Sequence, residues 1–311
     1  MRSTYGSMPA YGNKKPEKKS LLGRLVILGV VVCLGYVLGT AGIVWYLIGG
    51  SSTGLMTHPK TQGVDVGEVE FVNAEGMTLR GWYSPVKERP VILMAHGRGG
   101  HRTQFSPLYT FLFRSCRLGF LTFDFRGAGL SDGFWSTGGI REAEDLKAAI
   151  DWLVQKKNYS LKDIGIVAFD MGALAALRLE ERLPKLGAIV LVAPSESPVR
   201  SLKRTLRRFY LPVHPTATIA LAAARKLAGT DLDPKRPYPT LESLRNIPLL
   251  MVGGEEDQVS PPPFLRGLYQ RIPGEAKTIR IHKGIDHAGL LSADHPSVTK
   301  DIAEFLSIAF R

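Results

Sequence analysis

Cysteine is scarce in this sequence, which has only Cys33 and Cys116 among 311 residues. Two cysteines cannot supply the several bridges of a disulfide framework. Cys33 lies in an apolar segment and Cys116 in a segment of helical pattern, so we interpret both as packing residues. The sequence also has no internal repeat. It predicts no metal site and no cofactor.

Charge is missing from one long stretch, because no charged residue occurs between Arg24 and Lys60. Residues 25–48 are almost entirely apolar, and about 20 apolar residues are enough to cross a bilayer. A buried core helix of this length would show a polar face. This segment has none, so we predict a transmembrane helix over residues 25–48. Trp45 and Tyr46 lie near its end, where interfacial aromatic residues occur.

The flanks of this helix predict its orientation. Residues 1–24 are polar and rich in lysine, and we expect a disordered basic tail. Because positive charge stays on the cytoplasmic side, we predict a single-pass cell-membrane protein with the remaining chain outside the cytoplasm. A cleaved signal peptide is the alternative, but its apolar core usually has about 7–15 residues, and no small-residue cleavage site follows here. Gly35 and Gly39 form a GxxxG pair that would bring two helices together in a homodimer.

Residues 49–63 form a Gly/Ser/Thr-rich linker, and residues 64–311 are predicted to form one α/β domain. Its first two strands, residues 66–72 and 78–83, form an antiparallel pair around a turn. Residues 91–95 are continuously apolar, as in a strand buried on both faces of a parallel sheet. Further strands are predicted at residues 119–123, 164–168, 188–192, 248–252 and 278–281. Their alternation with helical segments indicates a mostly parallel sheet.

The rest of the domain is organised around residues 164–174. A short buried strand runs directly into Phe169-Asp170-Met171-Gly172-Ala173, and a helical pattern follows without a linker. Ala168 and Gly172 stand two residues before and after Asp170, and small residues there let strand and helix approach closely. This is the context of a nucleophile elbow, a sharp turn that exposes its central side chain. The central residue is Asp170 rather than the usual serine.

Other motifs accompany this turn. His96-Gly97-Arg98-Gly99-Gly100 follows a buried strand, and residues 124–133 read DFRGAGLSDG. With a late aspartate and a later histidine, these motifs resemble the α/β-hydrolase superfamily, and most of all its membrane-tethered serine-hydrolase branch. The resemblance implies an eight-stranded sheet with helices on both faces, an oxyanion hole and a catalytic triad. The oxyanion donors would be the backbone amides of Arg98 and Met171, and the pocket would be shaped by His96, Gly97 and Gly172.

The same resemblance assigns the triad acid to Asp257 and the triad histidine to His287, each in a loop after a late strand. Alternatives in the same region are Glu255, Glu256, His282 and His295. Residues 129–133 match G-x-S-x-G literally, with Ser131 at the centre. That loop begins several residues after its strand, and no helix opens after it. We therefore interpret Ser131 as structural and Asp170 as the candidate nucleophile.

An aspartate at the elbow permits different chemistry from a serine. A carboxylate that attacks saturated carbon or opens an epoxide forms an alkyl ester, which water activated by His287 can hydrolyse while Asp257 orients the imidazole. The related haloalkane dehalogenases and soluble epoxide hydrolases use aspartate in this way. This sequence departs from them, because Met171 replaces a tryptophan beside the aspartate and no tryptophan adjoins His96. The cap tyrosines available to assist epoxide opening are Tyr210 and Tyr238.

Two other functions stay open. A negative Asp170 would repel the oxyanion of ordinary ester hydrolysis, so the chain could be a serine-hydrolase scaffold that lost its nucleophile and now binds a ligand. An anchored structural protein is the third reading. Because candidates for the acid and the histidine are both present, we favour a hydrolase. Its expected substrate is a small or lipid-like alkyl, epoxide or ester compound.

A cap is predicted at about residues 195–246, between two strands of the sheet. Within it, residues 199–210 place apolar side chains at helical spacing among five arginines and lysines. Such a basic amphipathic helix is typical of a membrane-surface element, and we expect it to contact anionic headgroups. A solvated helix that only covers the core is the alternative. Nucleic acid is not an expected partner, because the basic segment lies outside the cytoplasm and has no supporting fold.

Overall fold

The computed structural model describes residues 20–50, 58–208, 215–233, 238–239 and 241–311. The predictions for the basic tail up to residue 19, for residues 51–57 of the linker and for Tyr210 therefore lie outside the described residues.

Helix α1, Leu21–Ile48, begins four residues before the predicted start of the apolar helix. Ser20 caps it by accepting a hydrogen bond from the Gly23 N–H at 3.1 Å, which satisfies one of the unpaired amides of a helix start. An 18-residue window of α1 has a mean hydropathy of 2.4, and none of that window is buried within the protein. The helix is thus long and apolar enough to cross a membrane. Its orientation, and pairing through Gly35 and Gly39, remain predictions.

Eight strands form one sheet in the order β1-β2-β4-β3-β5-β6-β7-β8. They are β1 Gly67–Val72, β2 Thr78–Ser84, β3 Val91–Ala95, β4 Gly119–Phe123, β5 Ile164–Phe169, β6 Ala188–Val192, β7 Leu249–Gly254 and β8 Lys277–His282. The pairs β1–β2 and β2–β4 are antiparallel, and the other neighbours are parallel. The predicted α/β fold with a mostly parallel eight-stranded sheet is confirmed. Parallel strands bring their carboxyl ends, and the loops that follow them, to one edge of the sheet.

Helices cover both faces of the sheet. They are α2 Ser106–Phe111, α3 Glu142–Lys157, α4 Met171–Ala176, α7 Pro262–Arg271 and α8 Pro296–Ala309. Shorter helical turns are η1 Pro59–Gln62, η2 Arg102–Phe105, η3 Leu112–Cys116, η4 Leu161–Asp163, η5 Glu180–Lys185, η6 Leu241–Leu244 and η7 Gly289–Leu291. The segment of helical pattern that contains Cys116 is divided: α2 ends at Phe111, and η3 is a π-turn that ends at Cys116 and is followed by Arg117, whose φ is 51°.

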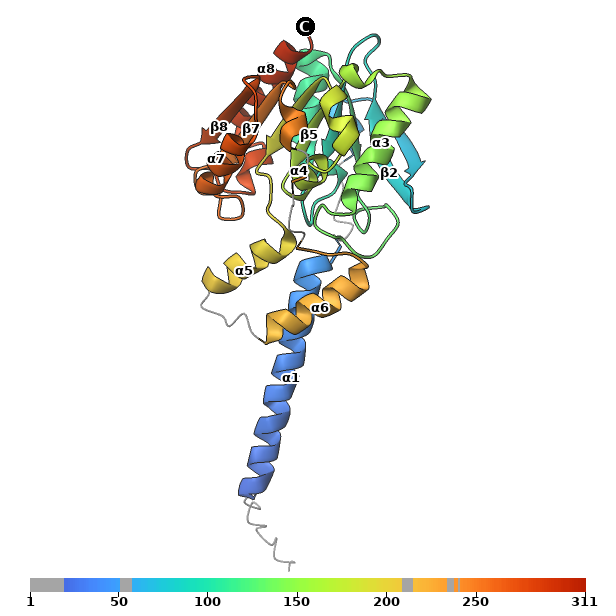
Figure 1. Ribbon diagram of the computed structural model, residues 1–311. Coiled ribbons are helices and arrows are strands. Elements are labelled where there is room, and N and C mark those ends of the chain that lie inside the picture. The colour runs from blue at the N-terminus through green and yellow to red at the C-terminus, as the bar shows by residue number, and fades with distance from the viewer. Residues whose placement is uncertain (1–19, 51–57, 209–214, 234–237, 240) are drawn as a thin grey trace, which may run out of the picture.

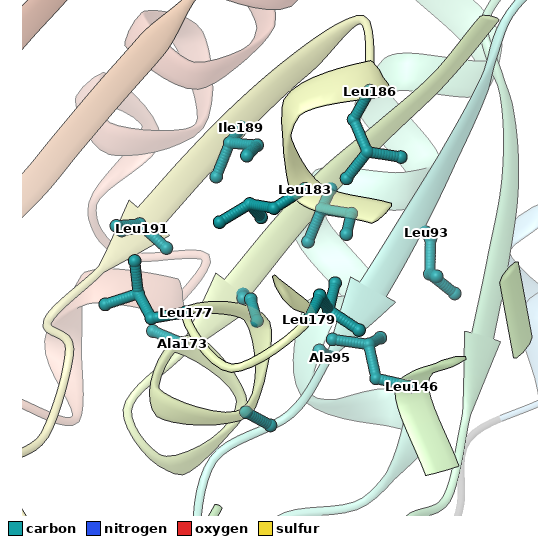
Figure 2. Close-up of a cluster of buried hydrophobic side chains, with 14 of the residues drawn as sticks. Leu93, Ala95, Leu146, Ala173, Leu177, Leu179, Leu183, Leu186, Ile189 and Leu191 are labelled. Carbon is teal, nitrogen blue, oxygen red and sulfur yellow. The ribbon is translucent and has the colours of Figure 1, made fainter. Parts of the chain in front are cut away.

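Successive side chains of each strand point to opposite faces, so β3 contributes side chains to two hydrophobic cores, one on each face of the sheet. Leu93 and Ala95 belong to the cluster covered by α3, α4 and α7; Figure 2 shows part of it, with Leu146 of α3 among the strand side chains. Ile92 and Met94 belong to the cluster covered by α2 and α8. Burial on both faces explains why β3 is continuously apolar.

The segment between β6 and β7 forms a cap of two helices, α5 Pro198–Arg208 and α6 Thr216–Ala228. Both lie beside the last turns of α1 (Figure 1). Leu47 and Ile48 of α1 are fully buried in a third apolar cluster, together with side chains of α5 and α6. The Ser136 N–H also donates to the Ile48 carbonyl at 2.8 Å. The end of α1 is therefore packed into the domain and not merely tethered to it.

Candidate active site

The predicted elbow is a strained turn between β5 and α4. Asp170 has φ 49° and ψ −110°, a conformation that costs a non-glycine residue about 1–3 kcal/mol. The Asp170 N–H donates to the Val192 carbonyl at 3.0 Å, and the Asp170 carbonyl accepts from the Ser195 N–H at 3.2 Å. Two residues later, a Cβ on Gly172 would lie 2.2 Å from the Ala95 carbonyl oxygen. Only glycine allows α4 to start this close to the end of β3.

The Asp170 side chain points to the loop after β3. Its Oδ2 accepts a hydrogen bond from the Arg98 N–H at 3.0 Å, and the residue is 7 % exposed. No hydrogen bond to Oδ1 is recorded within the described residues. A Cβ on Gly97 would lie 2.6 Å from the Phe169 ring and 3.0 Å from the Asp170 Cβ, so glycine is needed there for the two loops to meet. One predicted oxyanion donor is thus engaged by the candidate nucleophile itself.

Of the other predicted pocket residues, His96 stabilises the loop after β3 through both of its ring nitrogens. Its Nδ1 lies 2.8 Å from the Gly97 carbonyl oxygen, and its Nε2 accepts from the Phe125 N–H at 3.0 Å. A carbonyl can only accept and an amide can only donate, so the ring is neutral with its proton on Nδ1. Complete burial, the largest influence, lowers the pKa of His96 although the charge of Asp124 raises it. His96 therefore shapes the loop as a neutral ring.

Asp257 and His287 lie in contact on the loops after β7 and β8. His287 Nδ1 is 2.8 Å from Asp257 Oδ2. Asp257 is fully buried, and its Oδ1 accepts from the Val259 and Ser260 N–H groups, both at 2.8 Å. These two backbone donors hold the carboxylate so that Oδ2 faces the imidazole. Nδ1–H then donates to Asp257, which leaves Nε2 as the basic nitrogen.

His287 is influenced by more than one carboxylate. Burial lowers the pKa of His287, but the hydrogen bond with Asp257 raises it, and the charge of Asp170 raises it further. Asp286 adds to this effect, and the result is a pKa above the ordinary 6.5. Within the described residues no direct hydrogen bond joins Asp170 to His287. Phe169, the residue before Asp170, packs its ring against the His287 imidazole with centroids 4.8 Å apart, so the structure brings all three predicted residues to the same edge of the sheet.

The alternative candidates lie elsewhere. Glu255 and Glu256 are exposed, and His282 lies 3.5 Å from Asp301. Ser131 Oγ donates to the Asp124 carbonyl and accepts from the Arg80 N–H, so its role in the loop after β4 is structural. Among the described residues, no group of three or more His, Cys, Asp or Glu side chains could hold a metal ion.

A small cavity of about 50 Å³ borders the elbow. It is lined by Tyr46, Arg98, Gly138, Asp170, Met171, Ser195, Glu196, Pro198 and Val259. Tyr238 is not among these residues, and its hydroxyl donates to the Ser195 carbonyl at 2.7 Å. Tyr46 was not predicted as a site residue, because its position in the apolar helix indicated only an interfacial aromatic. A larger groove of about 710 Å³ lies between β1 and α3 and contains none of the predicted site residues.

Comparison with known proteins identifies the fold. The sequence model of the alpha/beta hydrolase family matches residues 92–301. The chain belongs to the alpha/beta hydrolase family. The matched range includes β3 to β8 together with the elbow, Asp257 and His287. The resemblance of the motifs to the α/β-hydrolase superfamily is thereby confirmed.

Individual relatives of this alpha/beta hydrolase are distant. The polyketide transferase grgF of a Penicillium species is 30 % identical over 133 residues, which are 41 % of this chain and 44 % of the transferase. The uncharacterised protein YfhR of Escherichia coli is 24 % identical over 242 residues, 75 % of this chain and 77 % of YfhR. The structure of the Pyrococcus furiosus esterase Pf2001 superposes with a TM-score of 0.66 at 24 % identity, covering 84 % of this chain and 99 % of the esterase. At that identity the likeness shows a shared fold.

Proposed function

We propose that this alpha/beta hydrolase uses Asp170 as a nucleophile on the saturated carbon of an epoxide or alkyl halide, with His287 and Asp257 completing the reaction. The observation that carries the proposal is the 3.0 Å hydrogen bond from the Arg98 N–H to Asp170 Oδ2. It holds one carboxylate oxygen at an oxyanion-type donor and leaves Oδ1 to attack. A carboxylate held in this way suits displacement at carbon better than attack on an ester carbonyl.

In the first step, Oδ1 of Asp170 forms a bond to carbon, and the electron pair of the broken bond goes to the leaving atom. A halide leaves as the anion. An epoxide oxygen takes a proton, which His287 can supply because its raised pKa favours the imidazolium form. The product is an alkyl ester of Asp170, and Oδ2, beside the Arg98 N–H, becomes its carbonyl oxygen.

In the second step, neutral His287 takes a proton from water at Nε2 while the water oxygen attacks the ester carbonyl. Negative charge then develops on Oδ2, where the Arg98 N–H stabilises it and the Met171 N–H is the second proposed donor. Collapse breaks the bond between the carbonyl carbon and the alkyl oxygen. The alkoxide takes the proton from His287. Asp170, which now holds one oxygen from water, gives its remaining carboxyl proton to His287 and returns to the carboxylate.

The mechanism is tested by trapping the ester. His287→Gln keeps the nucleophile but removes the base. With a panel of alkyl halides, whose displacement needs no proton from His287, intact-mass spectrometry should show an adduct that maps to Asp170. Asp170→Asn is the matched control and should show none. In heavy-oxygen water, a single turnover of the native chain should label the Asp170 peptide and leave the product unlabelled. A labelled product with an unlabelled peptide would mean direct attack by water and would refute the nucleophile.

A binding protein derived from a serine hydrolase is the second candidate. It is favoured by the cavity volume of about 50 Å³, because small-molecule sites usually enclose about 300–1,000 Å³. Asp170→Ser distinguishes the two. Gained ester hydrolysis, together with no adduct on the native chain from any alkyl substrate, would support a retained site whose nucleophile was lost. An adduct on native Asp170 would exclude this candidate.

For location and partners, the proposal is a single-pass cell-membrane protein with its N-terminus in the cytoplasm. The exposed apolar length of α1 supports membrane insertion, and the exposed Arg207 of α5 supports contact with anionic headgroups. Arg204 of the same helix is instead bonded to Glu196 and to the Val259 carbonyl. Protease treatment of intact cells should digest the domain, and protection of the domain would reverse the orientation.

A further inference from the structure

The last turn of α1 forms part of the candidate site. Tyr46 lines the same cavity as Asp170 and Met171, although it lies more than a hundred residues earlier in the chain. Leu47 and Ile48, the next two residues, are fully buried. The cavity wall therefore consists partly of the helix that is proposed to cross the membrane.

Arg98 connects this turn to the elbow. Its backbone N–H holds Asp170 Oδ2 at 3.0 Å, while its guanidinium donates to the carbonyl oxygens of Tyr46 and Leu47. The guanidinium carbon also lies 5.4 Å from the centre of the Tyr46 ring. A cation at a helix C-terminus, where carbonyls lack helical partners, is favourable. One residue thus positions both the membrane helix and the candidate nucleophile.

The exposed length of α1 locates this cavity relative to a bilayer. Residues 21–42 are exposed along nearly their whole length, and at 1.5 Å per residue they span about 33 Å, close to the roughly 30 Å of a hydrocarbon core. Packing against the cap begins at Ile43. Tyr46 lies four residues beyond Gly42, or about 6 Å along the axis. The cavity is therefore at the depth of the lipid headgroups.

The exposed side chains of the cap helices also favour a position of the cavity at the depth of the lipid headgroups. Ile219 and Leu227 of α6 are 49 % and 51 % exposed, although α6 packs against α1. Arg207 of α5 is also exposed. Exposed apolar side chains on α6 and an exposed cation on α5, two helices that contact α1, are suited to the interface of an anionic bilayer.

We infer that the substrate site is shared between the domain and the last turn of α1, and that it takes the small reactive end of an amphiphile whose tail stays in the bilayer. The inference rests on the proposed function for the reactive group, an epoxide or alkyl halide. The cavity of about 50 Å³ is far smaller than the roughly 300–1,000 Å³ of sites that enclose a whole small molecule. It fits a three-membered ring but not a whole lipid, so the remainder of the substrate must lie outside it, and the neighbouring medium is the bilayer.

The test uses the full chain in anionic vesicles and a long-chain terminal diazirine, whose three-membered ring has the shape of an epoxide. After illumination, labelled peptides are mapped by mass spectrometry. Label should appear on the cavity wall away from α1, at Gly138 or at Ser195 to Pro198. A short-chain diazirine at the same bulk concentration should label these positions about tenfold less or weaker still, because each buried methylene adds about 0.8 kcal/mol to membrane partition.

Tyr46→Trp fills the cavity from its α1 side and should lower this labelling about threefold or more. Tyr36→Trp is the matched control, since Tyr36 is exposed to a similar degree, 38 % against 41 % for Tyr46, but does not line the cavity, and it should leave the labelling unchanged. Label confined to residues 21–42, equal labelling by the short-chain probe, or equal effects of the two variants would overturn the inference. Labelling needs no turnover. Cavity labelling without a covalent Asp170 adduct in the His287→Gln trapping experiment would refute only the proposed chemistry. An Asp170 adduct without cavity labelling would refute only this inference.

Discussion

Replacing Asp257 by asparagine tests how the two proposed steps are divided between residues. Asp257 Oδ1 accepts two backbone N–H groups at 2.8 Å, from Val259 and Ser260. An asparagine must keep its oxygen there, because the amide nitrogen cannot accept from them. Its NH2 group would then stand where Oδ2 lies, 2.8 Å from His287 Nδ1. Two donors cannot face each other, so the ring proton of His287 would move from Nδ1 to Nε2. Nε2 could then no longer accept a proton from water.

The expected loss is large and confined to the second step. A triad imidazole in the wrong tautomer loses about 10⁴ in turnover, which corresponds to about 5.4 kcal/mol at 1.36 kcal/mol per decade. Attack by Asp170 on an alkyl halide needs no proton from His287. The adduct on Asp170 should therefore form at a rate within a few-fold of the native rate and then persist.

The assay pairs steady-state turnover of an alkyl halide with intact-mass detection of the adduct. Asp286→Asn is the control, because Asp286 is exposed and, within the part of the chain that the structure describes, its side chain accepts a hydrogen bond only from the Gly289 N–H, at 2.8 Å. It should keep turnover within a few-fold of native. The proposed assignment of Asp257 to the second step alone is wrong if the rate of adduct formation in Asp257→Asn falls as far as turnover. It is also wrong if Asp257→Asn and Asp286→Asn lose turnover equally. Thermal unfolding of both variants checks that the fold is intact.

Further outcomes concern the pH dependence of turnover, the stability of the domain and vesicle binding. Turnover of an alkyl halide should rise with pH through a pKa above 6.5, because neighbouring carboxylates raise the pKa of His287 and only its neutral form is a base. Asp286→Asn removes one of those charges and should move this rise to lower pH in a turnover profile. Gly172→Ala should destabilise the domain by about 1–3 kcal/mol in denaturant unfolding, since its Cβ would lie 2.2 Å from a backbone oxygen. Gly267→Ala in α7, with nothing within 4 Å of its Cβ, should instead stabilise it by about 0.5–1 kcal/mol. Arg207→Gln should weaken binding to anionic vesicles relative to neutral ones in a flotation assay, and equal binding to both would contradict headgroup contact.

The strands were the elements that sequence patterns predicted most accurately. Each of the eight was predicted, and the observed ends differ by no more than two residues. A strand buried on both faces needs an uninterrupted apolar run, which is visible in the sequence. Helix α6 was not predicted within the cap. The sequence around residues 216–228 is rich in alanine and weakly patterned, and α6 packs against the distant helix α1.

The residues of the candidate site also divide into those that were predicted from the sequence and one that was missed. Asp170 was identified from its turn, since the small residues at 168 and 172 are a local steric requirement of the elbow. Asp257 and His287 came from the family resemblance, and their contact agrees with it. Tyr46 was missed as a wall of the cavity because no local pattern relates an interfacial aromatic to a loop after β3.

The sequence by itself determined the apolar helix, the order of strands along the chain and the elbow with its aspartate, because these depend on side-chain periodicity and on steric limits within a few residues. Only the tertiary structure decided that the Arg98 N–H engages Asp170 Oδ2 and that the Arg98 guanidinium holds the end of α1. These contacts join residues that are 72 and about 50 positions apart. They arise where the carboxyl ends of parallel strands meet the packed end of α1, and that meeting depends on the packing of the whole domain.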